Sequence, residues 1–394
     1  MKQPIRLYFI DLIRAYAICM MLQGHFTDSL LGYDFRDSNN IFYSIWLYNR
    51  GITAPVFFTV SGFIFTYLLI KDKAHLGWDN IRVRKGIKRG LMLLGIGYAL
   101  RMNIGGLLIG EIYDGFYMID VLQCIGLSLL LIITVYMLTL KAKSWIMPSI
   151  LLFFTLFLFA FEPIYSQQSF DFLPKAIANY FTKRNGSVFT IFPWFGYAAF
   201  GAFLGYVFNY FKEHKHIYTY AISTAFIGGI AFLFGSSPLF WKLYEVTNFD
   251  IFKLIHDNNY LFARLGNVLL IFGIFMLLQN VITSRKFREI GQNTLSIYVI
   301  HFMLLYGSFT GIGLYKFFNH QLAPIIVVPG AMAFVMVTVF LSFKYNLYKP
   351  DLDAKLAIVK QEVQVRSIDA LHITVDLAIR LKNKIVALFG WKKY

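Results

Sequence analysis

The sequence has few charged residues and few cysteines for its length. Only 15% of its 394 residues are Asp, Glu, Lys or Arg, against roughly 25% in soluble domains. The two cysteines, Cys19 and Cys124, lie inside apolar segments, so neither a disulfide framework nor a zinc site is expected. No group of His, Asp or Glu has metal-ligand spacing, and no glycine-rich phosphate loop follows a strand. We therefore expect an enzyme or carrier that works without a metal.

Long apolar segments recur along the whole chain, and 58% of all residues are hydrophobic. A soluble core of this length has no room for so much apolar surface. Since a membrane-spanning helix needs about 20 apolar residues, the sequence predicts an all-α, polytopic membrane helix bundle with about ten transmembrane helices. The predicted spans are 8–31, 51–70, 90–110, 119–140, 145–163, 189–211, 217–236, 263–283, 290–309 and 324–343.

The net charge of +16 comes from short basic clusters between the apolar segments. Basic clusters follow every second predicted span, a pattern that places those loops and both termini in the cytoplasm. This distribution favours a multi-pass protein of the inner cell membrane over a nucleic-acid-binding protein. We expect a transmembrane domain at 1–349 and a basic cytoplasmic tail at 350–394. The tail suits a helix on the anionic inner leaflet, and a solvated tail is the alternative.

The first predicted span carries ionisable residues, which are costly in a bilayer and usually face a protein interior. Asp11 and Arg14 are three residues apart and can pair. His25 lies 11 residues after Arg14 and returns to nearly the same helix face. Asp28 follows His25 by three residues and is placed to accept a hydrogen bond from its ring. A structural ion pair and an interior packing histidine are the alternative interpretation of this stripe.

Three further groups are candidate site residues. His301 lies in the ninth span, toward the same side of the membrane as His25, as a second site residue or as a packing donor. Arg101 lies deep in the third span and needs a partner, for which Glu111, Asp114 and Asp120 are the nearest choices. The inner mouth of the third span carries a basic cluster that suits phosphate, although the positive-inside rule alone also explains it. This cluster includes Arg82, Arg84, Lys88 and Arg89.

Several segments together resemble the transmembrane acyltransferase superfamily. Residues 6–25 match its first helix, with Asp11, Arg14 and a histidine at the outer end. Residues 50–63 resemble its second helix, and 290–301 resemble a late helix found across the superfamily. The segments 120–126 and 192–196 resemble the heparan-α-glucosaminide N-acetyltransferase branch. One departure is that many members place glycine after the arginine, where this chain has Ala15. Bacterial O-acetyltransferases of surface polysaccharides are similar too, since they share the histidine at position 25.

The resemblance implies that acyl-CoA, usually acetyl-CoA, enters from the cytoplasm and that an extracytoplasmic sugar or glycan accepts the acyl group. His25 would act as general base, or form a transient acyl-histidine, with Asp28 orienting its ring. Ser61 or Arg101 would stabilise the oxyanion. Asp11 and Arg14 would organise the donor channel, and the basic cluster would hold the nucleotide. A transporter or flippase of a small polar or lipid-linked substrate, and a non-catalytic scaffold, are the alternatives.

Overall fold

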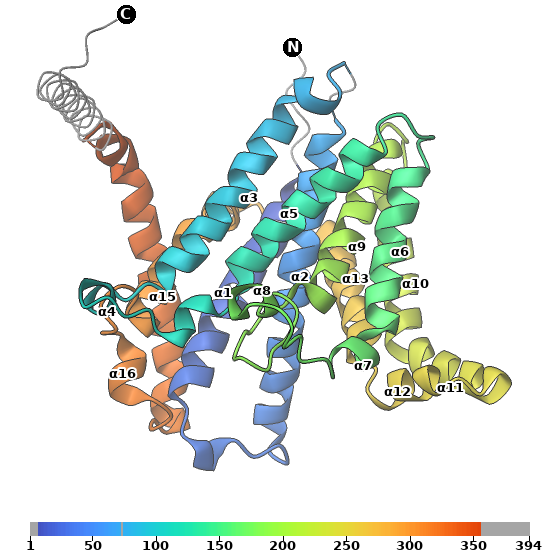
Figure 1. The fold of residues 1–394 in the computed structure, drawn as a ribbon. Coiled ribbons are helices and arrows are strands. Elements are labelled where there is room, and N and C mark those ends of the chain that lie inside the picture. The colour runs from blue at the N-terminus through green and yellow to red at the C-terminus, as the bar shows by residue number, and fades with distance from the viewer. Residues whose placement is uncertain (1–6, 72–73, 356–394) are drawn as a thin grey trace, which may run out of the picture. The chain divides into compact units, whose positions relative to one another are not determined.

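The structure is a computed structural model that describes residues 7–71 and 74–355. These residues are almost entirely helical (Figure 1), and the β-type pairings among them are two isolated bridges, Leu31 with Leu322 and Asn103 with Phe309. The longer helices are α1 (Tyr8–Leu30), α2 (Ile41–Leu69), α3 (Ile81–Leu100), α5 (Val121–Leu138), α6 (Ile146–Ala160), α9 (Ile191–Tyr210), α10 (Ile217–Ile230), α11 (Ser236–Thr247), α13 (Tyr260–Leu278) and α15 (Thr294–Tyr306).

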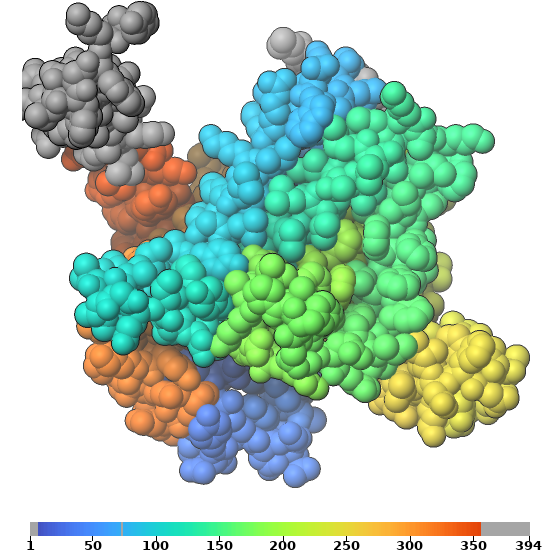
Figure 2. Space-filling model, in the orientation of Figure 1, coloured from blue at the N-terminus to red at the C-terminus, as the bar shows by residue number. Residues whose placement is uncertain are grey.

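Short helices connect these elements or cap their ends. They are η1 (Tyr33–Phe35), η2 (Gly77–Asp79), α4 (Ile104–Leu108), η3 (Asp114–Tyr117), α7 (Glu162–Tyr165), α8 (Lys175–Ala178), the π-helical η4 (Ala231–Gly235), α12 (Asp250–Asp257), α14 (Arg285–Gln292) and α16 (Leu314–Phe318). A last long helix spans Pro324–Lys355. In Figure 2 the hairpin of α11 and α12 projects from the neighbouring helices as a separate lobe.

The chain divides into two compact units, residues 1–339 and 340–394. All candidate site residues lie in the first unit. The described part of the second unit is helical, and the Lys344 ammonium group lies 5.7 Å from the centre of the Phe340 ring. Beyond Lys355, the predicted basic tail lies outside the described residues.

Helix α1 forms the centre of the first unit because its neighbours cover most of its surface. It packs against α2, α13, α14 and α15. Its apolar side chains Phe9, Leu12, Ile18 and Leu22 have no exposed surface. A helix that is apolar on nearly all sides must be buried or face lipid, and here protein covers it. The ionisable stripe therefore faces a protein interior, as the sequence predicts, and Asp11 itself is 8% exposed.

Helices α2 and α9 meet backbone to backbone at glycines. A Cβ atom on Gly62 would overlap the carbonyl group of Ala198, and one on Gly201 would overlap the carbonyl group of Thr59. Small residues permit such close approach, and the dispersion attraction between closely packed backbones stabilises helix pairs in a membrane. This packing fixes α2 and thereby the side chains that α2 sends toward α1.

Every predicted span overlaps at least one helix, and six described helices are long and apolar enough to cross a membrane. They are Ile41–Leu69, Asp114–Leu138, Ile191–Tyr210, Ile217–Thr247, Tyr260–Leu278 and Pro324–Lys355. One helix end and two helix starts differ from the prediction. Helix α3 ends at Leu100, so Arg101 lies at its C-terminal end and not deep inside a span. Helix α2 begins at Ile41 because the side chain of Asn40 caps it, and α3 begins at Ile81 because Asn80 caps it. The basic residues 82–89 therefore lie on a helix and not in a loop.

Candidate active site

Two histidines from distant parts of the chain face each other. Nδ1 of His25, on α1, lies 3.3 Å from Nε2 of His301, on α15. The two ring centres are 5.3 Å apart and the rings are inclined by 65°. His301 is fully buried, whereas His25 keeps some exposed surface. Because one nitrogen of the pair must donate and the other accept, the tautomer of each ring depends on the other.

Aromatic side chains of α15 surround this pair. The rings of Tyr298 and His301 lie 4.8 Å apart, and the ring of Tyr306 lies 6.3 Å from that of His25. The Tyr306 hydroxyl is 3.2 Å from the Ser29 hydroxyl on α1. These contacts hold α15 against α1 and restrict the rotation of both imidazoles.

The sequence analysis expected Asp28 to accept a hydrogen bond from the His25 ring, but the Asp28 carboxylate has other partners. Its carboxylate lies 2.7 Å from Nη2 of Arg50, on α2, and 3.5 Å from Nη1 of Arg36. The Arg36 guanidinium also donates to the Asp28 carbonyl and to Nδ1 of His320, at 2.5 and 2.6 Å. The Asp28 carboxylate therefore pairs with Arg50 and Arg36. The His25 nitrogen that Asp28 was expected to contact lies against His301 instead. Asp28 joins α1 to α2 and to the segment before α2.

Arg101 pairs with Asp120, one of its three predicted partners. Nε and Nη2 of Arg101 lie 3.0 and 2.7 Å from the same carboxylate oxygen, and the two side chains are only 15% and 12% exposed. Nη1 donates to the Gly115 carbonyl at 3.3 Å. Asp120 also caps α5 through Gln123 and acts electrostatically on His25. The Arg101 donors are thus already used, which argues against the oxyanion role expected for them.

Ser61 is also remote from the histidines. Its hydroxyl donates to the Phe57 carbonyl of its own helix at 2.8 Å. It lies 11 residues beyond Arg50, the residue of α2 that reaches Asp28, which is roughly 16 Å along a helix. The Ser61 hydroxyl is thus engaged within α2, and its oxyanion role stays a prediction.

Asp11 and Arg14 lie toward the opposite end of α1, with Arg14 roughly 16 Å from His25 at 1.5 Å per residue. Asp11 acts electrostatically on Arg14. Both side chains also reach beyond α1, since Arg14 donates to the Thr294 hydroxyl at 2.8 Å and Asp11 accepts from the Gln292 amide at 3.2 Å. These two partners lie at the junction of α14 and α15. The pair therefore joins α1 to this junction.

The predicted donor cluster occupies the first turns of α3. Arg82, Arg84, Lys88 and Arg89 are all exposed. Arg84 donates to the Trp78 carbonyl at 3.1 Å, and Arg89 acts electrostatically on Arg14. The cluster and Arg14 therefore share the end of the bundle opposite the histidines.

The sequence analysis missed Arg50, Tyr298 and Tyr306. Tyr298 and Tyr306 are eight residues apart, with His301 between them. Tyr298 is three residues before His301 and so lies on the same side of the helix, a signal that could have identified it. Tyr306, five residues after His301, is about 140° away around the helix and gave no such signal. The sequence around Arg50 gave no comparable signal, because arginines are common at the ends of predicted spans whether or not they have a function.

The described helices and the contact between the two histidines define a multi-pass membrane protein with a polar centre at one end of the bundle. The model of the heparan-alpha-glucosaminide N-acetyltransferase catalytic domain matches residues 6–244. The chain belongs to this family, which indicates an acetyltransferase. A comparison with curated proteins finds no match. His25 lies within the matched segment and His301 lies beyond it.

Proposed function

We propose that the protein transfers an acetyl group from cytoplasmic acetyl-CoA, or another acyl-CoA, to a hydroxyl or amine of an extracytoplasmic sugar or glycan. In this proposal ten helices cross the inner membrane and both termini are cytoplasmic. The Arg14 end of α1 faces the cytoplasm and the His25 end faces outward. The alternation of basic loops supports this orientation.

The contact between His25 and His301 is the observation that carries the proposal. In the proposed mechanism, Nδ1–H of His25 donates to Nε2 of His301, which leaves the lone pair of His25 on its own Nε2. This nitrogen removes a proton from the acceptor hydroxyl or amine as the acceptor oxygen or nitrogen attacks the thioester carbonyl. The carbon–sulfur bond breaks, and the CoA thiolate leaves toward the cytoplasm. His301 acts as a positioning residue, because it touches His25 and not the reacting atoms.

A covalent route uses the same nitrogen. Nε2 of His25 would attack the thioester, and the acceptor would then remove the acyl group. The tautomer that His301 imposes serves both routes. Acid-quenched protein incubated with labelled acetyl-CoA alone distinguishes them, since only the covalent route leaves label on the chain.

The donor end supplies the positive charge that acyl-CoA needs. Its nucleotide and phosphates would contact Arg82, Arg84, Lys88 and Arg89, which are exposed at the start of α3. Arg14 lies farther into the bundle and would receive the start of the pantetheine arm. The thin arm suits a route between helices, whereas the charged nucleotide stays at the surface.

Purified protein tests this function directly. With radiolabelled acetyl-CoA and a glycan acceptor, the protein should release CoA over many turnovers only when the acceptor is present. His25→Ala should reduce this release to a low residual rate, whereas His214→Ala, at an exposed histidine of another loop, should preserve it. Release of CoA by His25→Ala at the normal rate would refute the proposal. Uptake of acceptor into vesicles without CoA release would indicate a transporter instead.

A further inference from the structure

Helices α10, η4 and α11 form one continuous helix that is longer than a membrane is thick. It runs over the 31 residues Ile217–Thr247, and at 1.5 Å per residue its length is about 46 Å. The hydrocarbon core of a bilayer is only about 30 Å thick. Tyr218, in the first turn of α10, lies 6.2 Å from the ring of Phe9 at the start of α1, so the excess length falls at the other end. Helix α11 therefore lies at or beyond the membrane surface.

The continuous helix bends where α11 begins. Pro238 lies in the first turn of α11, where it has no N–H to donate and its ring crowds the carbonyl group of Phe234. The preceding segment, Ala231–Gly235, is π-helical. Prolines and π-helical turns are the usual causes of helix bends. Figure 1 shows the result, since α11 and α12 extend sideways from the bundle and do not continue the direction of α10.

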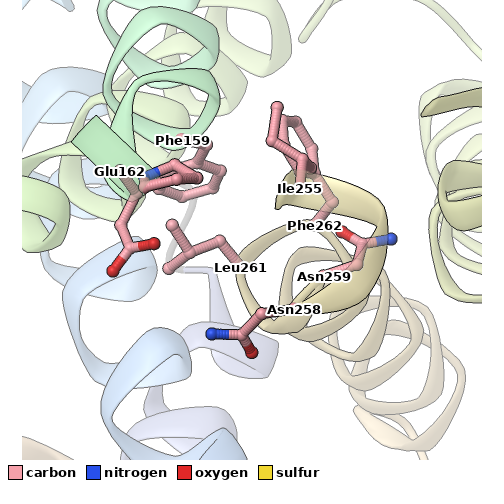
Figure 3. A pocket seen from close by; sticks show the side chains of 8 residues that line it. Phe159, Glu162, Ile255, Asn258, Asn259, Leu261 and Phe262 are labelled. Carbon is pink, nitrogen blue, oxygen red and sulfur yellow. The ribbon is translucent and has the colours of Figure 1, made fainter. Parts of the chain in front are cut away.

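Hydrogen bonds and packing fix the hairpin of α11 and α12 at its base. Nδ2 of Asn259 donates to the hydroxyl groups of Ser236 and Ser237, at 2.6 and 2.8 Å. On the other side, α12 and the start of α13 line a small pocket together with Phe159 of α6 and Glu162 of α7 (Figure 3). The hairpin is thus held to α6, α7 and α13, so its sideways direction is part of the fold.

Helix α12 covers one side of α11 and carries charge on its own outer side. The ring of Phe252, on α12, is stacked with that of Phe240, on α11, with centres 6.2 Å apart. The Lys253 ammonium group lies 5.9 Å from the centre of the Tyr244 ring. Lys253 and Asp257 are exposed. A helix with one apolar face on protein and charges on the other is typical of a surface in water.

The side of α11 away from α12 is apolar and not covered by the described residues. Leu239, Leu243 and Val246 recur at spacings of four and three and form one line along the helix, the α11 stripe. Leu239 and Val246 are 57% and 72% exposed, and Ser236 is the one buried residue of α11. Lys242 is exposed beside the stripe. An apolar stripe bordered by a lysine is typical of a helix that lies on a membrane.

The continuous helix itself indicates what covers the stripe. Before the bend, α10 has two buried residues, Ala225 and Gly229, and its exposed apolar side chains face lipid. The uncovered apolar surface continues past the bend into α11 and reaches Phe249 in the turn after it, which is 63% exposed. Trp241 is 40% exposed, and such aromatic residues gather at membrane interfaces. The lipid that surrounds α10 is therefore next to the α11 stripe.

We propose that α11 lies in the headgroup region of one leaflet, with the α11 stripe among the upper acyl chains and α12 facing water. Lys242 extends from the edge of the stripe to the lipid phosphates. The leaflet is the one at the His25 end of the bundle, because Arg264 of α13 packs against Gly51, the neighbour of Arg50. This placement is independent of acetyl transfer.

A fluorescent label on the full chain tests this placement in nanodiscs of phosphatidylcholine and phosphatidylglycerol, whose two faces are both accessible. Cys19→Ser and Cys124→Ser remove the native thiols, and nitrobenzoxadiazole is attached through Val246→Cys or through Asp257→Cys, the control on α12. Dithionite should bleach the label at position 246 about tenfold more slowly than the label at 257, and a doxyl lipid should quench only the former. Equal bleaching rates would overturn the proposal. Slow bleaching without quenching would overturn it too, since a protein surface, such as a second copy of the chain, would then cover the stripe.

A charge placed in the α11 stripe tests whether lipid contact holds the helix down. Leu239→Asp should raise the bleaching rate at position 246 about tenfold, because a carboxylate is costly among acyl chains. Asn248→Asp adds the same charge in the turn outside the stripe and should leave the rate unchanged. Both variants should elute from size exclusion as the parent protein does. An unchanged rate in Leu239→Asp would contradict the proposal, and loss of folding in that variant would show that protein packs on the stripe instead.

Discussion

His25 and His301 are 276 residues apart in the chain, yet their ring nitrogens lie 3.3 Å from each other. The contact joins the first helix to a late one and gives the only fully buried histidine of the described residues a specific partner. A packing role alone does not require ring nitrogens to face each other. A role of His301 in positioning His25 does require this, because the contact between the nitrogens selects the tautomer of His25.

Replacement of His301 should reduce turnover more than substrate binding. His301→Phe keeps the ring volume but removes the acceptor for Nδ1–H of His25, so kcat should fall roughly 100-fold with a small change in KM. His301→Gln keeps a hydrogen-bonding side chain and should retain more activity. Steady-state kinetics on purified protein measures both. A larger change in KM than in kcat would indicate a substrate contact at His301.

Asp28→Asn distinguishes a structural role of Asp28, in its ion pairs with Arg50 and Arg36, from a role in orienting the His25 ring. The ion pairs with Arg50 and Arg36 are partly exposed, and such pairs contribute at most about 1 kcal/mol. We therefore expect a small loss of thermal stability and a modest loss of activity. A 100-fold fall in kcat at unchanged stability would instead return Asp28 to the role of orienting the His25 ring. Fluorescence-detected size exclusion after heating provides the stability measurement.

The glycine contact between α2 and α9 gives a stability prediction. Gly201→Val should destabilise the protein by about 2 kcal/mol or more, because the added atoms overlap the Thr59 carbonyl group. Gly95→Ala is the control, since a Cβ atom on Gly95 meets nothing within 4 Å. Equal melting temperatures for the two variants would show that α2 and α9 do not pack as described.

The sequence predicted the helical class, the approximate positions of the long helices and the burial of the α1 stripe, because apolar length and the cost of buried charge are local properties. It also identified both histidines. It did not predict their contact, since pairing of α1 with α15 depends on packing between distant segments. For the same reason it did not predict the partners of the Asp28 carboxylate. Spacing along α1 allowed a contact with His25, but Arg50 and Arg36 compete for the carboxylate from outside the helix.

The most direct test of the central claim is a double-mutant cycle on His25 and His301. The acceptor-dependent rate of CoA release is measured for His25→Ala, His301→Phe and the double variant. If His301 acts only through His25, the double variant should be no slower than His25→Ala alone. Independent, multiplying losses from the two substitutions would contradict the account.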